Sequence, residues 1–439
     1  MKINAILPYN YTTVKKNNDV IFKRSAKIIN TNNDGIIKIF TDLAKIPSPS
    51  LKETGVANWI LSFCQKNKIK AVLDGYKNIK LNIPATDSLK SPLLFSAHMD
   101  VVGDDSPVNI VKDNDFIKTD GKRTLGADDK SGIAAALMLA KEFSKSPIKH
   151  GGLEMLFTRD EELGMTGIMN ADLQDIKSKY VLVLDEAKLG RFDNTGADYI
   201  TAILSLTTLF GGHSGINIGD KYRLNAVKLI SELLYRIPQG VYYKDKSGVV
   251  TSINHGTIIG GDIQNTATKI VEDKLVSDNY LEYFIKNAVT NVINTKAIAA
   301  ISIRSSNKGK ENELKGKIEN IIEKFNQKYN GLASAKINYD ELMPIFKTNE
   351  AKTLEKVYKE ACKTIGLKPN IGTFHAGAET HIFINKKNKN NENFKPILLG
   401  IADIFDMHSS SERISISSLK KGYELIREMF LKFNMCQNK

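Results

Sequence analysis

Five short clusters of acidic residues and histidines stand out in this chain, and four of them directly follow an apolar run. The clusters are His98 with Asp100, Asp128 with Asp129, Asp160 with Glu161 and Glu162, and the single residues Asp185 and His408. Open α/β sheets gather chemistry at the carboxyl ends of their strands, so we expect these side chains to meet. Oxygen and nitrogen ligands without cysteine suit Zn²⁺, Co²⁺ or Mn²⁺, with zinc the default for hydrolysis. Six groups are too many for one tetrahedral zinc, so the pattern predicts a metallohydrolase with two metals.

The first two of these clusters also have plainer interpretations. His98 and Asp100 are two residues apart, which suits one metal ligand and one residue that orients it, or else an exposed polar turn. Asp128 follows a glycine at a predicted helix start, where an aspartate is often only an N-cap. The positive end of a helix also favours a carboxylate that must bridge two cations.

The remaining clusters follow strand-like segments. Glu161 and Glu162 are adjacent at a predicted strand end and therefore face different directions, so one can bind metal while the other acts as general base. Asp185 closes an apolar strand and is either a turn cap or a ligand. His408 alone would more often be structural. We favour a metal centre because all five clusters are expected at the same edge of the sheet.

Length and composition limit the class of protein. The chain has 439 residues, 42% hydrophobic and 25% charged, which suits a globular protein of two domains. Its net charge of +13 comes from lysines spread along the whole chain, so we expect no nucleic-acid partner. Three widely spaced cysteines suit a reducing compartment, and we expect a cytoplasmic protein. No run of 18 apolar residues occurs, so no membrane span is expected.

Alternating strand and helix patterns predict an α/β fold with a mostly parallel sheet. Ser50 and Glu53 stand in capping-box relation and predict a helix start there. We expect residues 35–195 and 334–439 to form one discontinuous catalytic domain. Residues 196–333 read as an inserted α+β domain, and residues 1–34 as an N-terminal extension.

These motifs, in this order, resemble the peptidase T-like family of di-zinc exopeptidases over residues 35–430. Its superfamily includes tripeptide aminopeptidases, the carboxypeptidase G type of glutamate carboxypeptidase, aminoacylases and a diaminopimelate desuccinylase. The resemblance implies that His98, Asp128 and Asp185 hold one zinc. It implies that Asp128, Glu162 and His408 hold the other, with Asp128 as the bridge. Asp100 is similar to the family's orienting aspartate, and Glu161 to its general base.

The insertion resembles the family's lid and dimerisation domain. The resemblance implies that His213, in the segment GGHSG, reaches the active site of a neighbouring subunit in a homodimer. Asn265 and Arg304 are similar to lid residues that contact substrate, and a guanidinium suits a peptide carboxylate. About twenty residues near 273–293 look inserted relative to that family. The segment TFHAGAETHIF at 373–383 is closer to the aminoacyl-histidine dipeptidases, so Glu379 and His375 are expected to shape the substrate pocket.

We therefore expect a zinc-dependent exopeptidase for short peptides, foremost a di- or tripeptide aminopeptidase. The same metal centre would also serve an N-acyl amino acid deacylase or a carboxypeptidase. A basic, non-catalytic binding module is the alternative from another class, and its binding would weaken with salt and need no metal.

Overall fold

The computed structural model describes residues 34–246, 248–261, 289–348 and 352–436. Three predicted features lie outside these described residues: Asn265, most of the insertion near 273–293, and the N-terminal extension except for Asp34. Among the helices of the described part, none is long and apolar enough to cross a membrane.

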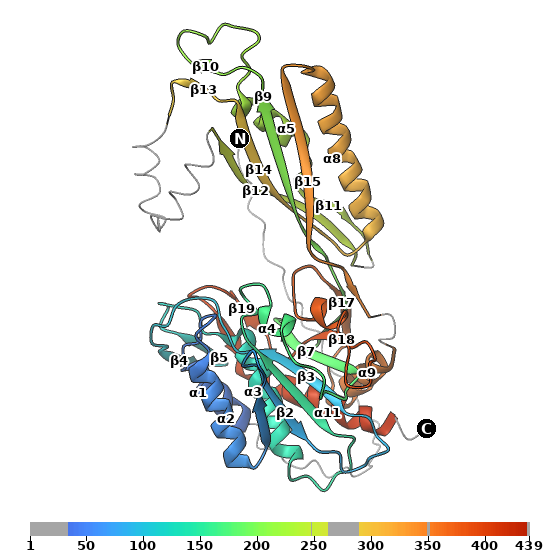
Figure 1. Cartoon of the computed structure of the whole chain (residues 1–439). Helices are drawn as coiled ribbons and strands as arrows, with labels where there is room; N and C mark the ends of the chain where they lie inside the picture. The colour runs from blue at the N-terminus through green and yellow to red at the C-terminus, as the bar shows by residue number, and fades with distance from the viewer. Residues whose placement is uncertain (1–33, 247, 262–288, 349–351, 437–439) are drawn as a thin grey trace, which may run out of the picture. The chain divides into compact units, whose positions relative to one another are not determined.

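The largest element is a nine-stranded mixed sheet (Figure 1). Its strands are β1 (Lys70–Leu73), β2 (Ile79–Ile83), β3 (Leu93–His98), β6 (Leu153–Thr158), β7 (Tyr180–Glu186), β8 (Arg191–Gly196), β16 (Phe346–Lys347), β17 (Asn370–Phe374) and β18 (Lys395–Gly400). They follow the order β1-β2-β6-β3-β7-β18-β8-β16, and β17 also pairs with β8. The central strands β6, β3, β7 and β18 are parallel, which confirms the predicted α/β class. Both edges are antiparallel.

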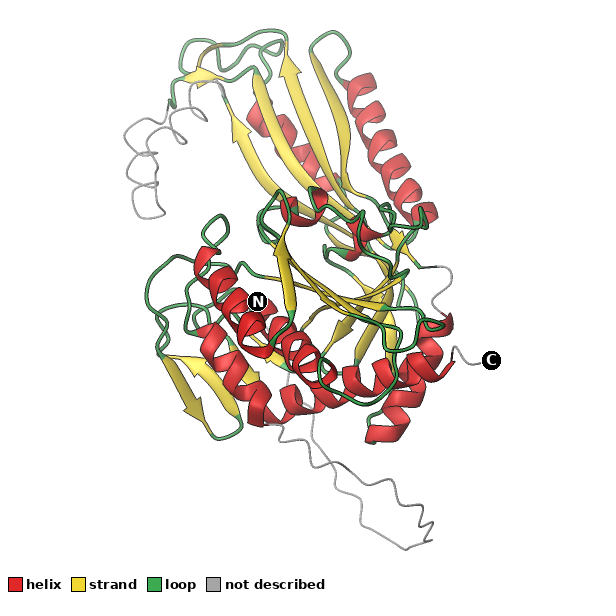
Figure 2. Ribbon diagram, turned by 60° about the horizontal axis from the view of Figure 1, so that its bottom comes forward, coloured by secondary structure: helices red, strands yellow, loops and turns green. Residues whose placement is uncertain are grey.

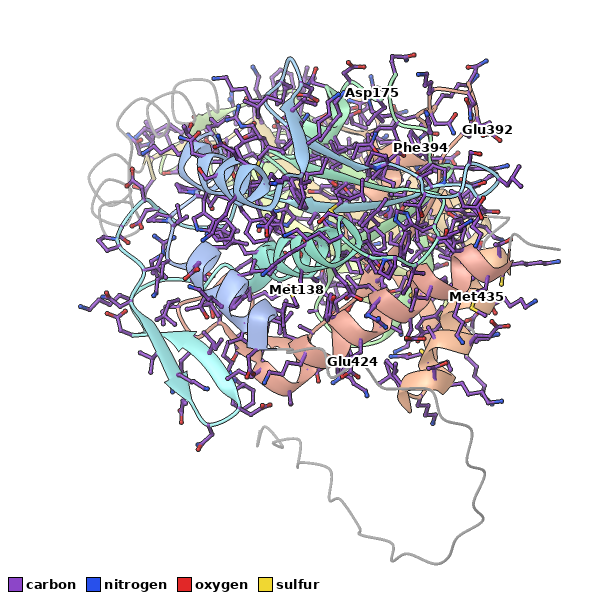
Figure 3. All side chains as sticks on the ribbon, turned by 90° about the horizontal axis from the view of Figure 1, so that it is seen from below. Met138, Asp175, Glu392, Phe394, Glu424 and Met435 are labelled. Carbon is purple, nitrogen blue, oxygen red and sulfur yellow. The ribbon has the colours of Figure 1, made fainter. Side chains whose placement is uncertain are left out.

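Helices cover both faces of this sheet, but unequally (Figure 2). The long helices α1 (Asp34–Ala44), α2 (Thr54–Asn67), α3 (Ala127–Phe143), α9 (Lys352–Ile365) and α11 (Ile416–Cys436) share one apolar core with one face. The short helices α4 (Thr166–Met169) and α10 (Thr380–Phe383) pack with the other face. Met138 packs against the first core, and Phe394 belongs to the second (Figure 3).

A separate antiparallel sheet forms from the inserted segment, which we call the lid. Its strands are β9 (Tyr199–Thr208), β11 (Gly240–Lys244), β12 (Val250–Gly260), β14 (Lys296–Ser305) and β15 (Ala333–Met343), in the order β11-β12-β14-β9-β15. Helices α5 (Ala226–Arg236) and α8 (Lys308–Lys328) share its apolar core. Strands β10 (Gly212–His213) and β13 (Val292–Ile293) form a short ribbon.

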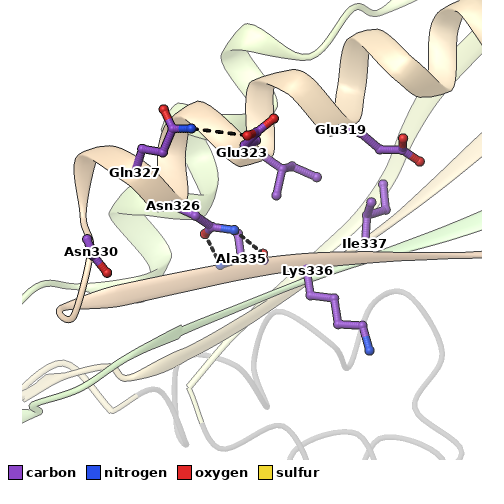
Figure 4. A pocket seen from close by; sticks show the side chains of 9 residues that line it. Glu319, Glu323, Asn326, Gln327, Asn330, Ala335, Lys336 and Ile337 are labelled. Carbon is purple, nitrogen blue, oxygen red and sulfur yellow. Dashed lines mark hydrogen bonds between the residues drawn. The ribbon is translucent and has the colours of Figure 1, made fainter.

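The lid extends beyond the boundary expected from sequence. We placed the return to the catalytic domain at residue 334, but β15 pairs with β9 from Ala333 to Met343. The alternation along this segment indicates a strand without indicating which sheet it joins. As the edge strand, β15 also bonds to α8: Asn326 donates to the Ala335 carbonyl at 2.9 Å and accepts from its N–H at 2.8 Å (Figure 4). These bonds occupy backbone groups that face outward at the edge.

A fourth, small sheet has the order β19-β20-β5-β4. Its strands are β4 (Ile110–Asp113), β5 (Phe116–Thr119), β19 (Ile404–Phe405) and β20 (Arg413–Ser415). Because β19 and β20 flank residues 406–412, this sheet supports the segment that carries His408.

The capping box expected at Ser50 and Glu53 does not form. Helix α2 begins at Thr54, and Glu53 makes no side-chain cap bond. Ser50 Oγ instead donates to Asp100 Oδ2 at 2.7 Å, and the Glu53 carboxylate binds the Arg159 guanidinium at 2.7 Å. Tertiary partners therefore replaced the local pairing that the spacing suggested.

Candidate metal centre

His98 ends β3 and turns both ring nitrogens toward oxygen atoms. Its Nδ1 lies 2.9 Å from the Asp100 backbone carbonyl, and its Nε2 lies 3.2 Å from Asp128 Oδ1 and 3.7 Å from Asp185 Oδ1. A carbonyl can only accept, so Nδ1 carries a proton. In the neutral ring the lone pair of Nε2 then faces two carboxylate oxygens. Either a second proton or a metal cation must stand between these acceptors.

The pKa of His98 reflects the same crowding. Burial by itself lowers this pKa, but the surrounding aspartates outweigh burial and raise it well above its usual value. Imidazole nitrogen and carboxylate oxygen are the donors that zinc accepts, so the residues present fit a metal as well as a proton.

Asp128 faces two imidazoles at once. Its Oδ1 lies near His98, and its Oδ2 lies 3.2 Å from His408 Nε2. His408 Nε2 also lies 3.2 Å from Glu162 Oε1, a buried oxygen without a hydrogen-bond partner in the described structure. One N–H cannot point at both carboxylates, whereas one cation could bind both oxygens and the imidazole. Burial alone would raise the pKa of Asp128, but hydrogen bonds to His408 and His98 first, and to Asp185 after them, hold it well below its usual value.

The described residues offer a further acid near His98, in addition to Asp100, Asp128 and Asp185. Asp129 joins His98 and Asp185 in a cluster whose ligand atoms lie within 4.8 Å of one another, as does the cluster of His98, Asp128 and Glu162. Asp129 is buried, accepts a hydrogen bond from Gly132 N at 3.0 Å and leaves Oδ2 unpaired. The peptide bond between Asp128 and Asp129 is cis. Sequence reasoning named Asp129 but gave it no role.

Glu412 anchors the loop that carries Asp128. Its carboxylate accepts hydrogen bonds from the backbone N–H groups of Gly126, Ala127 and Asp128, at 2.8, 3.0 and 3.3 Å. It also accepts from the Thr124 hydroxyl. Because Glu412 follows His408 by four residues, it connects two ligand-bearing segments. The sequence analysis missed Glu412, and its only signal was an acid just after a candidate ligand.

Asp100 organises the other side of the centre. It accepts hydrogen bonds from the backbone N–H groups of Glu161 at 2.9 Å and Glu162 at 3.1 Å. Burial would raise its pKa, but bonds from His98 and Ser50 outweigh burial and lower the pKa to about 2. Asp100 is thus an ionised group that positions His98 and the two glutamates together.

Glu161 has the properties of a proton acceptor. Burial raises its pKa to about 8, and the negative charges of Glu379, Glu162 and Asp128 add to this rise. A base with a pKa near the working pH accepts and returns protons effectively. The pKa values of Glu162 and Asp185 are also raised, in both cases chiefly by burial.

Two of the expected substrate residues lie together near the ends of the lid strands. Arg304 on β14 stacks on the Tyr199 ring, 4.2 Å from its centroid, and its Nη1 is buried without a hydrogen-bond partner in the described structure. His375 Nε2 bonds to Ser252 Oγ at 2.8 Å, and β12 pairs Ser252 with Arg304. The pKa of His375 is lowered by burial first and by the Arg304 charge second.

Glu379 and His213 lie apart from this pair. Glu379 is buried and accepts a hydrogen bond from Ser96 Oγ at 2.9 Å. His213 is exposed, and its Nδ1 accepts from Gly215 N at 3.1 Å. It follows the far end of the ten-residue strand β9, roughly 30 Å from where that strand begins at Tyr199. Among the described residues, no hydrogen bond or ion pair joins His213 to the histidines and acids of the candidate centre.

Comparison with known proteins fits this architecture. The model of peptidase family M20/M25/M40 matches residues 94–432. The uncharacterized protein YqjE of Bacillus subtilis is 24% identical over 334 residues, which cover 76% of this chain and 79% of that protein. Peptidase T of Pectobacterium carotovorum is 27% identical over 180 residues, or 40% of each chain. Aminopeptidase PepT from Bacillus cereus has the same fold, with a TM-score of 0.74 at 19% identity over 92% of this chain and 99% of that one. The chain therefore belongs to peptidase family M20/M25/M40, and it is a peptidase T-like peptide hydrolase.

Proposed function

We propose that this protein is a di-zinc exopeptidase that removes the amino-terminal residue of di- or tripeptides. The observation that carries the proposal is Asp128, whose two oxygens face the imidazoles of His98 and His408 at 3.2 Å each. A bridging carboxylate between two imidazoles matches a two-metal site. The catalytic domain would comprise residues 35–195 and the chain after the lid, from about residue 344.

These contacts support the ligand assignment that the family resemblance implies. One metal would be held by His98, Asp128 and Asp185, and the other by Asp128, Glu162 and His408. When bound, the metals would polarise the scissile carbonyl and lower the pKa of the attacking water. Zinc is the first choice because the donors are imidazoles and carboxylates, and Co²⁺ or Mn²⁺ suit the same donors.

Glu161 is the proposed general base. Asp100 holds its backbone N–H at 2.9 Å, which directs the residue toward the centre while Glu162 serves as ligand. Glu161 takes a proton from the attacking water and passes it to the leaving amine. One residue can perform both transfers because a base that has taken a proton can return it as an acid.

Arg304 is the proposed receptor for the peptide carboxylate. Its guanidinium lies over the Tyr199 ring, and its unpaired Nη1 could donate to a carboxylate oxygen. His375 would line the same pocket. A receptor for the free carboxylate limits productive substrates to short peptides.

His213 is proposed to act across a homodimer formed through the lid. Its position beyond the far end of β9 favours a role in the active site of another subunit over a role in its own active site. There it would donate a hydrogen bond to the oxygen that becomes negative as water attacks the carbonyl. Three free cysteines suit a reducing compartment, and we propose the cytoplasm.

The direct test is hydrolysis of unblocked tripeptides by purified protein with measured metal content. We expect about two zinc ions per chain, loss of activity on chelation and its return on adding zinc. Activity that persists after complete metal removal would refute the proposal. Cleavage restricted to N-acylated amino acids would instead identify a deacylase.

A further inference from the structure

Glu379 lies beside the metal centre on the same face of the central sheet. Side chains two apart on a strand point the same way, so Leu94, Ser96 and His98 share one face of β3. Ser96 Oγ donates to Glu379 Oε2 at 2.9 Å. Ser96 precedes His98 by two residues, which is roughly 7 Å along a strand. The Glu379 carboxylate, bonded to Ser96, is therefore displaced from His98 by about this length along β3.

This carboxylate has no cationic partner in the described part of the chain. Glu379 is only 1% exposed, and its Oε1 has no hydrogen-bond partner. Burial raises the pKa of Glu379, and the hydroxyls of Thr158 and Ser96 lower it. The charged groups that act on this pKa are His98 and Asp100 of the metal centre, and Glu379 in turn raises the pKa of Glu161. It belongs to neither cluster with metal-ligating geometry. A buried carboxylate oxygen left unpaired beside other acids is unfavourable, and a ligand cation would offset that.

The surroundings of Glu379 are apolar on the side away from the centre. Its neighbour Ala378 and the nearby Phe383 belong to the core beneath this face, and the methyl groups of Met165 and Met343 pack against Gly377. Such a setting strengthens a charge–charge contact because little water screens it.

We propose that the Glu379 carboxylate binds the free α-ammonium group of the peptide substrate. This inference rests on the proposed peptidase function and names the class of substrate for the same site. The α-nitrogen is attached to the carbon next to the scissile carbonyl, so it must lie within a few ångströms of the reacting atoms. Glu379 is a buried acid near the metal centre with an unpaired oxygen, and it is neither one of the proposed metal ligands nor the proposed base.

The consequence is selection at both ends of the substrate. Glu379 recognises the ammonium group, and Arg304 is positioned for the carboxylate. A blocked amine would leave Glu379 buried and unpaired, and such a site rejects the wrong ligand strongly. The protein is then specific for short zwitterionic peptides, which excludes N-acyl amino acids.

The experiment compares one tripeptide in three forms: unblocked, N-acetylated, and lacking the α-amino group. The enzymes are zinc-loaded wild type, Glu379→Gln and Glu379→Asp, with Glu154→Gln as a control. Glu154 is likewise buried, but at the opposite end of β6, where it accepts from Ser178 N at 2.8 Å. We expect wild type to prefer the unblocked peptide by about 100-fold or more in kcat/KM. Glu379→Gln should lose most of that preference through a higher KM, and Glu379→Asp should retain part of it.

The outcomes separate this inference from the proposed function. Metal-dependent cleavage of any form supports the peptidase. A wild type that does not discriminate against the two amine-free forms overturns the role of Glu379. A Glu379→Gln variant that is equally impaired on all three forms of the tripeptide also overturns this role, because equal loss indicates a structural defect. If Glu379→Gln does not fold, Ser96→Ala, which removes only the anchor at Oε2, should still weaken the preference. A metal-loaded wild type that cleaves none of the forms overturns both proposals.

Discussion

Asp128 shows how one residue can serve two positions in the proposed centre. It lies in the first turn of α3, where its backbone departs from helical geometry and its side chain faces the carboxyl ends of the parallel strands. The positive end of the helix favours its charge, and the imidazoles of His98 and His408 share its two oxygens.

Replacing the proposed base Glu161 by glutamine tests the proton transfer without changing the size of the side chain. We expect Glu161→Gln to lower kcat by roughly 100- to 10,000-fold while the content of bound zinc stays unchanged. The reason is that the amide keeps the shape of the side chain but cannot take the proton. Steady-state kinetics with metal analysis would measure this. A variant with wild-type kcat would remove Glu161 from the mechanism.

Glu412 should act through metal binding. Replacing Glu412 by alanine removes the acceptor for three backbone N–H groups and frees both the Asp128 loop and the His408 segment. We expect zinc affinity to fall by about 10- to 100-fold, measured by competition with a chromogenic chelator. Glu313→Ala, on the exposed face of α8, is the control and should bind zinc normally. Equal affinities in the two variants would contradict the positioning role.

At the scale of elements, close packing of α11 decides the position of the His408 segment. Gly422 on α11 lies so near the Ile401 backbone that an added Cβ would overlap the Ile401 carbonyl oxygen. The chain that follows Ile401 continues through β19 to His408. Only glycine at this position allows α11 to approach the Ile401 backbone so closely.

This contact gives a matched pair of glycine substitutions. Gly422→Ala should destabilise the protein by at least about 1–3 kcal/mol, because the backbone must move. Gly316→Ala lies in α8 with no atom within 4 Å of the new methyl group, so it should stabilise by about 0.5–1 kcal/mol through helix propensity. Urea unfolding measures both. The same sign for the two variants would show that the close approach is unimportant.

At the scale of the whole molecule, a buried acid pair lies where the chain passes from the nine-stranded sheet to the five-stranded sheet. Asp198, just before β9, accepts from Ser305 N at 2.7 Å, and its backbone N–H bonds to the Ser305 carbonyl at 2.9 Å. Burial first, and the neighbouring Glu311 second, raise the pKa of Asp198 to about 8. Lys308 and Lys315 form ion pairs with Glu311, so Glu311 is the ionised member of the acid pair.

This pair predicts a pH dependence of stability. Unfolded aspartate has a pKa of about 3.9, so the folded state binds the extra proton between about pH 4 and 8. The stabilising contribution is complete below the unfolded value and is lost as the pH rises through about 8. Asp198→Asn cannot titrate but still accepts from Ser305. We expect its stability relative to wild type to be greater at pH 8 than at pH 5, measured by urea unfolding. Parallel profiles would contradict a shared proton.

Much of this protein could be predicted from local pattern. Apolar runs indicated the strands β3, β6, β7 and β18, and the polar residues that follow them indicated one edge of the sheet. His98, Asp128, Glu162 and His408 do converge at that edge, as their spacing along the chain suggested. Such inference works because alternation and strand ends are properties of the nearest few residues.

Pairing between distant segments could not be predicted in the same way. Ser50 bonds to Asp100 rather than capping α2, β15 joins the lid sheet, and Glu412 holds the Asp128 loop. Each depends on which segments the folded chain brings together, across separations of 50 to more than 280 residues in the two side-chain cases. The sequence by itself determined the elements and the types of ligand. Only the tertiary structure decided which acids are paired and which, like Glu379, are buried without a cation, because burial and partners are set by packing rather than by neighbours in the chain.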